Sequence, residues 1–428
     1  MPASSAAHKH AALDVDWVRA QFPSLRLTVN GHPAAFLDAP AGTQVPQRVA
    51  DAMRDYLLHD NANTAGAFAT SRRTDAMLLE AHQAMADFLG CGRDEVYFGQ
   101  NMTSLTFALA RAIGRDLRPG DEIVVTTLDH DANVAPWRAL EEQGIVIRQA
   151  DIHTEDCTLD MDDLRRKITG RTKLVAVGYA ANAVGTINDV HEVVRLARAA
   201  GAWSFIDAVH YAPHGPIDVR ALGCDFLACS PYKFFGPHQG VIYGKREHLV
   251  RLHPHKVRPA PESLPDRWET GTLSHEAIAG IAAAVDYIAS IGRRFVPGVP
   301  EGAAGRREAI LAAYNVIRDY ESALARKMIA GLLDIPGLTF YGISEPARFA
   351  HRVPTVGIRL ARAKPAEIAA FLGERGIFTW DGNYYAINLT ERLGVESNGG
   401  LLRIGLVHYN TSEEVDRLLA ALRELAAH

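Results

Sequence analysis

The chain contains little cysteine. Its four cysteines are Cys91, Cys157, Cys224 and Cys229. Their spacing matches neither a disulfide framework nor the closely spaced ligand pairs of a zinc site. We therefore expect free thiols in a reducing compartment, and no metal.

An excess of positive charge is also missing. Lysine and arginine number 45 against 50 acidic residues, which gives a formal net charge of −5. Proteins that bind nucleic acids need basic residues to neutralise phosphates. The densest basic pairs, such as Arg72-Arg73, are too short to form a basic patch. The composition therefore predicts no nucleic-acid partner.

Long apolar runs are missing as well. No stretch approaches the roughly 18 uninterrupted apolar residues that a membrane span requires. The first 14 residues are rich in Ala, Ser and His and have no apolar core, so they do not resemble a secretory signal. We expect a cytoplasmic protein without a membrane partner, whose first dozen residues are disordered.

What is present is an alternation of strands and helices. Between about residues 95 and 245, short apolar runs alternate with amphipathic stretches such as Asn188–Ala200. Strands that are apolar throughout are typical of a sheet covered on both faces by helices. The pattern predicts an α/β fold with a mostly parallel, seven-stranded sheet. The expected strands are Val96–Gly99, Glu122–Thr127, Val146–Ala150, Leu174–Gly178, Ser204–Asp207, Phe226–Cys229 and Gly240–Tyr243.

After about Gly292 the pattern changes to a smaller α+β region. At 428 residues the chain exceeds the usual size of a single core, so two domains are expected. We predict an N-terminal segment (1–28) that packs on the small domain, a large domain (29–292) and a small C-terminal domain (293–428). The expected small-domain elements are a helix at Glu308–Leu333, strands at Leu338–Tyr341 and Thr355–Leu360, a helix at Pro365–Arg375, a loop at Trp380–Asn388, a strand at Leu401–Val407 and a helix from Ser412.

One lysine follows a buried strand directly. In the segment Ser230-Pro231-Tyr232-Lys233, the lysine comes four residues after Cys229, the last residue of the expected strand, and precedes an apolar pair. A lysine in such a place suits a Schiff base with a carbonyl cofactor, because desolvation lowers the pKa of its amine. The alternative is a surface lysine in a strand-to-hairpin turn.

A carboxylate follows a neighbouring strand. Asp207 ends the expected strand Ser204–Asp207, and ligands bind at the carboxyl ends of parallel strands. A carboxylate there can pair with a protonated pyridine nitrogen and keep the cofactor an electron sink. The alternative role for Asp207 is a helix N-cap.

These motifs resemble a known family. Ile206-Asp207-Ala208-Val209-His210 and Ser230-Pro231-Tyr232-Lys233, with similarity from Phe22-Pro23-Ser24-Leu25 to Tyr409-Asn410-Thr411, resemble the fold-type I, class V aminotransferases that depend on pyridoxal 5'-phosphate (PLP). The most similar branch contains the group II cysteine desulfurases and selenocysteine lyases. The resemblance implies a large PLP-binding domain, a small C-terminal domain and a homodimer that acts on an amino acid.

The resemblance also implies roles for single residues. Lys233 corresponds to the Schiff-base lysine, Asp207 to the partner of the pyridine nitrogen, and His130 to the histidine that stacks on the ring and shuttles protons. His210 stands where the family often has a glutamine beside the ring oxygen. Asn182 corresponds to the asparagine near ring and substrate. From spacing alone, His130 could equally be a histidine in a turn.

Phosphate contacts are expected at a helix N-terminus. The turn Gln100-Asn101-Met102-Thr103-Ser104 follows an expected strand and opens an apolar helix. Met102 replaces a threonine that is usual in the family, so backbone N–H groups and Thr103 must contribute more. Ser230 and Tyr232 correspond to further phosphate contacts. Thr272 resembles the contact supplied by the partner subunit, which implies a site shared across the dimer.

The substrate side of the site departs from the family. Arg403 corresponds to the arginine that binds the substrate carboxylate as a fork; the alternative is a surface arginine on an edge strand. Desulfurases carry a reactive cysteine in a mobile loop, and Tyr385 stands at that position here. Trp380 stands near a family arginine. The aromatic residues of this loop either determine specificity or pack between the domains.

The sequence therefore predicts a PLP enzyme that passes through a Schiff base of the substrate and an α-carbanion. Elimination of a β-substituent, as a C–S lyase without a persulfide cysteine, is the first interpretation. An aminotransferase or an amino-acid epimerase is the next. A non-catalytic PLP-binding or accessory protein is the remaining alternative.

Overall fold

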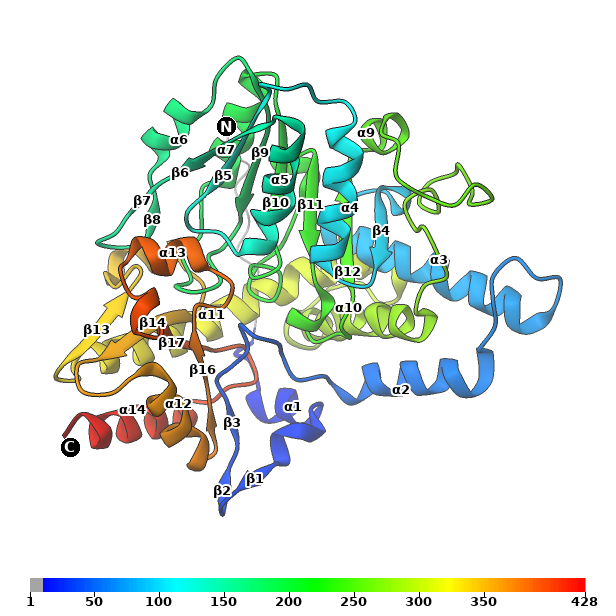
Figure 1. The fold of residues 1–428 in the computed structure, drawn as a ribbon. Helices are drawn as coiled ribbons and strands as arrows, with labels where there is room; N and C mark the ends of the chain where they lie inside the picture. The colour runs from blue at the N-terminus through cyan, green and yellow to red at the C-terminus, as the bar shows by residue number, and fades with distance from the viewer. Residues whose placement is uncertain (1–10, 428) are drawn as a thin grey trace.

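A seven-stranded sheet forms the centre of the large domain (Figure 1). The computed structural model describes residues 11–427. The strand order is β4-β12-β11-β10-β9-β5-β6, and only β12 runs antiparallel to its neighbours within this sheet. The predicted mostly parallel sheet is confirmed. Its strands are β4 (Val96–Gly99), β5 (Glu122–Thr126), β6 (Val146–Ala150), β9 (Thr172–Gly178), β10 (Trp203–Asp207), β11 (Phe226–Cys229) and β12 (Gly240–Gly244).

Helices cover both faces of this sheet. Successive residues of β5 show why: Ile123 and Val125 pack into one apolar cluster and Val124 into the other. The first cluster lies beneath α4 (Met102–Gly114) and α5 (Ala135–Arg138). The second is closed by α3 (Ala69–Leu89), α7 (Val190–Ala199), α10 (His275–Phe295) and α11 (Arg306–Leu333).

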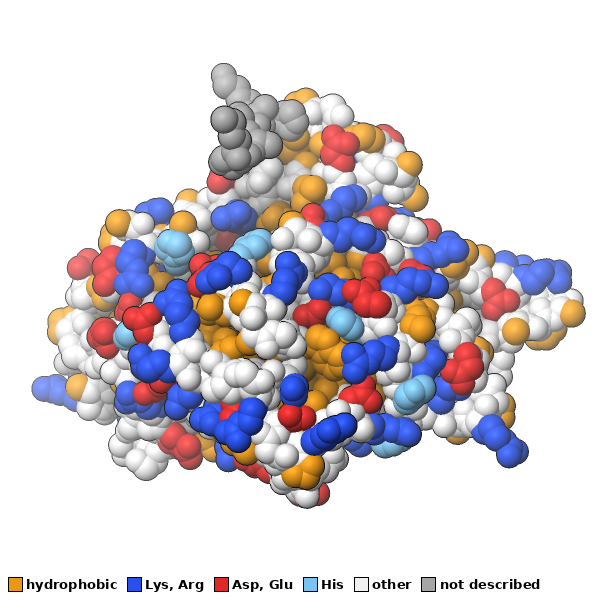
Figure 2. Space-filling model, turned by 90° about the horizontal axis from the view of Figure 1, so that it is seen from above, with side chains coloured by type: hydrophobic (Ala, Val, Ile, Leu, Met, Phe, Trp, Pro, Cys, Tyr) orange, Lys and Arg blue, Asp and Glu red, His pale blue; other side chains and the backbone are white. Residues whose placement is uncertain are grey.

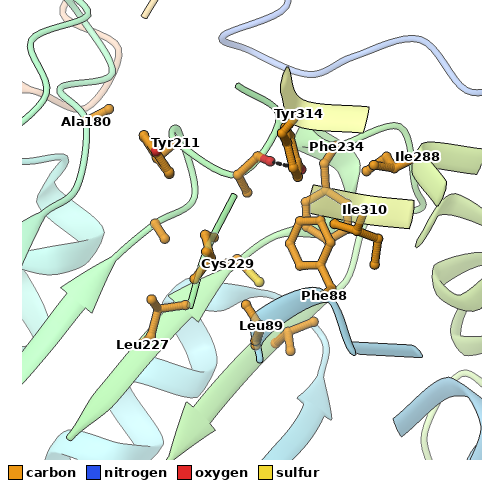
Figure 3. Packing of buried hydrophobic residues seen from close by; sticks show 14 of the residues in the cluster. Phe88, Leu89, Ala180, Tyr211, Leu227, Cys229, Phe234, Ile288, Ile310 and Tyr314 are labelled. Carbon is orange, nitrogen blue, oxygen red and sulfur yellow. Dashed lines mark hydrogen bonds between the residues drawn. The ribbon is translucent and has the colours of Figure 1, made fainter. Parts of the chain in front are cut away.

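The second cluster is the main core of the molecule, and Figure 3 shows part of it. The rings of Phe88 and Phe234 stack with centroids 4.7 Å apart, which joins α3 to the segment that follows Lys233. The Tyr314 hydroxyl donates a hydrogen bond to the carbonyl oxygen of Ala212. These contacts connect the loops that follow β10 and β11 to α3 and α11.

The small domain is built on a four-stranded sheet in the order β13-β14-β17-β16. Its core is formed with the C-terminal half of α11 and with two further helices. Its elements are β13 (Leu338–Tyr341), β14 (Thr355–Leu360), α12 (Pro365–Glu374), β16 (Trp380–Gly382), α13 (Ile387–Arg392), β17 (Leu401–Gly405) and α14 (Ser412–Ala427).

Most predicted elements of the small domain are confirmed, but the loop at Trp380–Asn388 is wrong in part. Trp380–Gly382 forms β16, which pairs antiparallel with β17, and α13 begins at Ile387. A three-residue strand that ends at Gly382, whose φ is 109°, is too short to give a strand pattern in the sequence.

The N-terminal part of the chain lies against the small domain. Helix α1 (Val15–Ala20) carries Arg19, which donates to the carbonyl oxygen of Tyr409 and forms an ion pair of 2.8 Å with Glu414. Further on, β3 (Ala35–Phe36) pairs in parallel with β15 (Ile377–Phe378). The division of the chain at residues 28 and 292 stays a prediction, and most of the segment expected to be disordered lies outside the described residues.

The remaining elements are short or peripheral. Acidic and basic side chains are interspersed on the face shown in Figure 2. Among residues 11–427 no helix is long and apolar enough to cross a membrane, and no group of three or more ligand side chains is placed to hold a metal ion. The short or peripheral elements of the fold are α2 (Gln47–Asp55), a π-helix at Tyr56–Asp60, α6 (Met161–Lys167), α8 (Val219–Leu222), α9 (Arg246–Arg251) and the strand pairs β1 (Thr28–Val29) with β2 (His32–Pro33) and β7 (Ile152–His153) with β8 (Thr158–Leu159).

Candidate active site

A cavity lies at the carboxyl ends of the parallel strands of the large sheet. The segments that follow β5, β9, β10 and β11 all contribute to its wall, as expected for a sheet of this topology. The space measures about 620 Å³, its part open to solvent included. Its lining brings together ten of the predicted or neighbouring side chains from distant parts of the sequence, all of them polar except Met102: Asn101, Met102, Thr103, His130, Asn182, Asp207, His210, Ser230, Tyr232 and Lys233.

Lys233 ends a single 3₁₀ turn, Pro231–Lys233, between β11 and β12. Its amine donates to the carbonyl oxygen of Pro40 and faces the cavity. Burial, reinforced by the charge of Arg403, lowers the pKa of the Lys233 amine to about 7. A large fraction of this amine is therefore neutral near neutral pH, which is the form that attacks a carbonyl carbon.

Two carboxyl groups lie at the floor of the cavity. Asp207 accepts a hydrogen bond of 2.9 Å from the N–H of Val209, and burial raises the pKa of Asp207 to about 6. Asp129 accepts from the N–H of Gly178 at 2.7 Å and from the Asn133 amide at 3.1 Å. Burial, together with the charge of Asp207, raises the pKa of Asp129 to about 8. A positively charged ring nitrogen beside Asp207 would favour its ionised form.

Two histidines in the lining are held neutral. The Nδ1 atom of His130 accepts from the N–H of Ala132 at 3.0 Å, which places the proton of the neutral ring on Nε2. Burial, with the charges of Lys233 and Arg403, lowers the pKa of His130 to about 3. The Nε2 atom of His210 lies 3.1 Å from the Thr355 hydroxyl oxygen, and burial lowers the pKa of His210 well below its ordinary value.

The opposite end of the cavity is the N-terminus of α4. The side chain of Asn101 caps this helix by accepting from the N–H of Ser104 at 2.8 Å. Helix geometry leaves the N–H groups of Met102 and Thr103 without an intrahelical acceptor. Gly240 of β12 packs against this turn so tightly that a Cβ there would lie 2.5 Å from the Met102 nitrogen. The turn is therefore held rigidly, with its N–H groups available to an anion.

Ser230 and Tyr232 also line the cavity. Ser230 is buried at the end of β11. The ring of Tyr232 stacks on His238 with centroids 4.9 Å apart, and its carbonyl oxygen accepts from Thr43. Both hydroxyl-bearing residues therefore line the cavity, and their contact with a phosphate stays a prediction.

A second, outer cavity of about 1180 Å³ opens above the first. Arg403 lies in its wall at the centre of β17, directly opposite Trp380 of β16. The Arg403 guanidinium donates to the carbonyl oxygen of Asn182 at 3.1 Å, and its central carbon lies 4.2 Å from the centroid of the Tyr384 ring. Burial lowers the pKa of Arg403 to about 10, so this group stays charged at neutral pH. Asp38, whose Oδ1 atom is buried without a hydrogen-bond partner, contributes negative charge nearby.

The loop after β16 closes the outer cavity and carries backbone strain. Tyr384 and Tyr385 adopt φ angles of 54° and 59°, a region that residues other than glycine rarely enter. The strain is held in place because the Asn182 amide donates to the carbonyl oxygen of Tyr384 and the N–H of Asp131 donates to that of Tyr385. As a result the ring of Tyr385 lies 5.3 Å from that of His130.

Thr272 is the one predicted site residue that lies elsewhere. It is exposed and lines a separate depression with Glu269 and Val257. Its predicted contact from a partner subunit stays a prediction.

No cysteine among the described residues lines either cavity. Cys157, Cys224 and Cys229 are buried, and Cys91 is half-buried. Burial raises the pKa of all four thiols, which keeps them protonated at neutral pH.

A family model for class V aminotransferases matches residues 35–297 and 306–418. The chain belongs to the class V aminotransferase family. A cysteine desulfurase from Dickeya dadantii is 32% identical over 428 aligned residues, which cover 96% of each chain. One from Pectobacterium atrosepticum is 31% identical and covers 96% of this chain and 98% of that protein.

Solved structures agree with this assignment. The apo cysteine desulfurase from Thermococcus onnurineus NA1 superimposes with a TM-score of 0.82 at 26% identity and covers 95% of this chain and 98% of its own. The cysteine desulfurase CsdA (S-sulfonic acid) from Escherichia coli gives 0.81 at 26% identity and covers 97% and 99%. The predicted fold-type I architecture is confirmed, and the chain is a cysteine desulfurase-like enzyme whose cofactor is PLP.

The residues present fit this cofactor. The lysine amine of lowered pKa, the buried carboxylate of Asp207 and the free N–H groups at the start of α4 lie around one cavity and suit an aldehyde, a pyridine nitrogen and a phosphate. The Oδ1 atom of Asn182 is buried in the lining without a hydrogen-bond partner, which leaves an acceptor for a bound group.

Sequence reasoning gave no role to several residues of the site. Asp129 lies three residues after the end of β5, so the rule that ligands bind after strand ends could have found it. Asp38 and Thr355 gave no such signal, because they reach the site only when the N-terminal segment and the small domain pack against the large sheet. Tyr384 was expected only as one aromatic residue of the loop, and its contact with Arg403 was not predicted.

Proposed function

We propose that this enzyme is a C–S lyase that removes the sulfur substituent of an amino acid by β-elimination, without an enzyme persulfide. The observation that carries the proposal is the lining of the site. Tyr385, not a thiol, faces His130, and no cysteine of the described chain reaches either cavity. A phenol cannot accept sulfur as a persulfide, so the sulfur must leave as a free thiol.

Two sets of residues would hold the cofactor in place. Asp207 would hold the proton of the ring nitrogen, while the N–H groups of Met102 and Thr103, with Ser230 and Tyr232, would bind the phosphate. His130 and His210 would border the ring. When bound, PLP supplies an electron sink for the charge that develops at Cα as its proton leaves.

The remaining steps use side chains of this chain. The guanidinium of Arg403 orients the substrate carboxylate, and the Tyr384 ring fixes the plane of that guanidinium. The Lys233 amine takes the Cα proton on Nζ, since a pKa of about 7 leaves a large fraction of this amine neutral near neutral pH. The Nε2–H of His130 can donate a hydrogen bond to the departing sulfur, and the proton that the sulfur gains can come from Lys233, which holds the former Cα proton.

The reaction balances without an oxidant or reductant. The Cα proton and the C–S bond are lost, the sulfur leaves with the bonding electron pair and gains a proton, and water completes the release of ammonia and a keto acid. A cysteine derivative therefore yields one sulfur compound that keeps the substituent of the original sulfur, one pyruvate and one ammonium ion.

A product assay tests this proposal. Cysteine, cystine and cysteine sulfinate are added singly to the purified holoenzyme, and pyruvate, ammonia and alanine are measured, with Lys233→Ala as the inactive control. Pyruvate and ammonia in equal amounts are expected. Alanine with sulfur retained on the protein by mass spectrometry would identify a desulfurase instead. A keto acid with the pyridoxamine form of the cofactor would identify an aminotransferase, and racemised substrate an epimerase.

We also propose that the working enzyme is a homodimer in which Thr272 of one subunit contributes to the phosphate site of the other. The proposal rests on the exposure of Thr272 and on its separation from the cavity of its own chain. Sedimentation equilibrium tests the assembly. Restored cofactor affinity in mixed dimers of Thr272→Ala with Lys233→Ala would support the shared site. A cytoplasmic location and the absence of a nucleic-acid partner stay predictions.

A further inference from the structure

A third cavity lies beside α11, between the large and the small domain, and we name it the boundary cavity. It measures about 540 Å³, its part open to solvent included. Tyr211 and His214 line it from the large domain, and Phe349 lines it from the segment before β14 of the small domain. Within residues 11–427 it shares no lining residue with the inner cavity around Lys233 or the outer cavity around Arg403. The boundary cavity is therefore a separate space.

The boundary cavity lies close to the active site. Tyr211 and His214 line the boundary cavity, while His210, on the same segment after β10, lines the inner cavity. The rings of His210 and His214 are in edge-to-face contact, with centroids 5.8 Å apart. On the small-domain side, Pro354 lines the boundary cavity and precedes Thr355, whose hydroxyl oxygen lies 3.1 Å from Nε2 of His210. A ligand in the boundary cavity would therefore contact the neighbours of an active-site residue.

A buried carboxyl group lines the boundary cavity. Glu321 is 3% exposed, and its Oε2 atom lies 2.7 Å from Nδ1 of His214. Burial raises the pKa of Glu321, and His214 and the N–H of His408 oppose this rise. The Oε1 atom of Glu321 is buried without a hydrogen-bond partner among residues 11–427. Since an unpaired buried acceptor is costly, this atom suits a donor on a bound molecule, and a cationic donor would favour the ionised carboxylate.

A guanidinium without a partner lines the same cavity. Arg318 is exposed, and within residues 11–427 its guanidinium has no hydrogen bond and no carboxylate at ion-pair distance. Burial raises the pKa of Tyr179, Tyr211 and Glu321, and the charge of Arg318 opposes this rise at all three, so the guanidinium lies near them. The spacing of Arg318, Glu321 and Ser322 places all three on one face of α11. The cavity therefore presents a free cation about one helical turn from a buried carboxyl group.

These two charges limit which ligands fit. A simple anion at Arg318 would also meet the negative charge of Glu321, and a simple cation at Glu321 would meet Arg318. Arg352, another cation of the lining, is already bound to backbone carbonyl oxygens. A molecule that carries both an ammonium group and a carboxylate complements both free groups at once. Ile187 and Phe349 add apolar surface to the wall, which suits a small apolar side chain.

We infer that the boundary cavity binds a small free α-amino acid with an apolar side chain, whose ammonium group bonds to Glu321 and whose carboxylate bonds to Arg318. The hydroxyl of Ser322 is a further donor for the carboxylate. This binding is distinct from the proposed lyase reaction and does not depend on it, because its residues lie outside the inner and outer cavities. Since the walls belong to both domains, the bound amino acid links them.

The active site must be closed to amino acids before this binding is measured. The linkage between Lys233 and PLP in the holoenzyme is therefore reduced with borohydride, so that an added amino acid cannot displace the lysine from the cofactor. The reduced holoenzyme is then used for calorimetric titration, with pyruvate release from the unreduced enzyme kept as the separate test of the lyase reaction.

Three probes with one branched carbon skeleton test the need for both charges. L-valine carries the ammonium group and the carboxylate, isobutylamine carries only the ammonium group, and 3-methylbutanoate carries only the carboxylate. Valine should bind with one molecule per chain. Each singly charged probe should bind about tenfold more weakly, the loss expected of one hydrogen-bonded charge.

Variants assign the binding to the boundary cavity. Arg318→Met and Glu321→Gln should each weaken valine binding about tenfold. Arg318 is exposed, and the amide of Glu321→Gln can still bond to His214, so both variants are expected to fold. Arg362→Met, at an exposed arginine, is the matched control and should leave valine binding unchanged. Arg403→Met should also leave it unchanged, because that arginine belongs to the outer cavity.

Several results would overturn the inference. One is the absence of valine binding to the reduced holoenzyme at concentrations up to about 10 mM, which corresponds to less than about 3 kcal/mol of binding free energy. Another is equal binding of valine and either singly charged probe. Valine binding that survives both Arg318→Met and Glu321→Gln would also refute the site, and loss of binding in Arg403→Met would place the ligand in the active site instead.

Discussion

The guanidinium carbon of Arg403 lies 4.2 Å from the centroid of the Tyr384 ring, and this pair joins a buried cation to a residue with a strained backbone. The ring belongs to a residue with a φ of 54°, and the guanidinium belongs to a buried strand with one hydrogen bond to Asn182. The Tyr384 hydroxyl donates to carbonyl oxygens of Leu401 and Trp380, on β17 and β16. These hydrogen bonds hold the Tyr384 ring in place over β16 and β17.

This arrangement predicts different effects for two substitutions of Tyr384. Tyr384→Phe keeps the ring, so KM should change less than about twofold, while stability falls by about 1 kcal/mol through the lost hydrogen bonds. Tyr384→Leu removes the ring, and KM should rise by about fivefold, the loss expected of one cation–π contact near 1 kcal/mol. Steady-state kinetics and urea unfolding measure both. An equal rise in KM for the two variants would mean that the ring does not position Arg403.

The buried amine of Lys233 should destabilise the folded apoenzyme at pH values below the pKa that this amine has in the folded state. Burial lowers that pKa from 10.5 to about 7. Between these values the unfolded chain binds a proton that the folded chain does not, so stability rises with pH across this interval. Below about pH 7 both states are protonated and the full penalty of burying the charge applies.

Lys233→Met removes this penalty. At about pH 6 the apo variant should be more stable than the apo parent by on the order of 1–2 kcal/mol, a value reduced for the solvent that reaches the cavity. The difference should shrink as the pH approaches about 10. Urea unfolding of both apoproteins measures it, and Lys364→Met at an exposed lysine is the control. A difference that does not depend on pH would contradict the assigned cause.

The thiols of the native protein should react slowly with Ellman's reagent. Three of the four cysteines are buried, and burial raises the pKa of Cys157 and of Cys224 to about 12. All four should react at once in denaturant. Tyr385→Cys places one thiol at a position that is 72% exposed in the parent, so this variant should show one fast-reacting group under native conditions. Rapid reaction of the native parent would mean that a cysteine is accessible after all.

Arg352 should be important for stability. It is buried, and its guanidinium donates to carbonyl oxygens of Ile343, Val353, Thr355 and Val184, the last of these in the large domain. Arg352→Met leaves these acceptors unpaired and should cost about 3 kcal/mol in unfolding free energy. Arg362→Met, at an exposed arginine, should change stability by less than about 0.5 kcal/mol. Equal losses for the two variants would refute this role.

The elements of the large sheet were predictable because their environment is uniform. Strands such as Phe226–Cys229 are covered on both faces and so are apolar throughout, which is visible in sequence. Their order was not predictable, and neither was the antiparallel direction of β12, because both depend on pairing between distant segments. The edge strand β6, which is partly exposed, had the boundaries expected from its β-branched residues.

The candidate site was predictable where it follows strand ends. Lys233, Asp207, His130 and Asn182 line one cavity because parallel strands end at one edge. The residues of the outer cavity could not be predicted from the ends of the strands. The role of Arg403 was predicted only from the family resemblance, because its contacts with Tyr384 and Asn182 depend on how the small domain packs.

The contact of α1 and β3 with the small domain also affects the order of synthesis. Arg19 donates a hydrogen bond to the carbonyl oxygen of Tyr409, and the Asn410 amide donates to the carbonyl oxygen of Phe36 at 3.0 Å. Residues that are synthesised first therefore form these hydrogen bonds with residues that are synthesised last. During translation, these contacts of α1 and β3 with the small domain can form only when nearly the whole polypeptide has left the ribosome, whereas Phe22 can pack earlier against Phe235 and Tyr287. The large sheet can form earlier, since its strands end at Gly244. A ribosome stalled near the last helix should therefore carry a folded sheet and an N-terminal segment that still lacks its contacts with Tyr409 and Asn410, and a protease should cut this segment faster than in the complete protein.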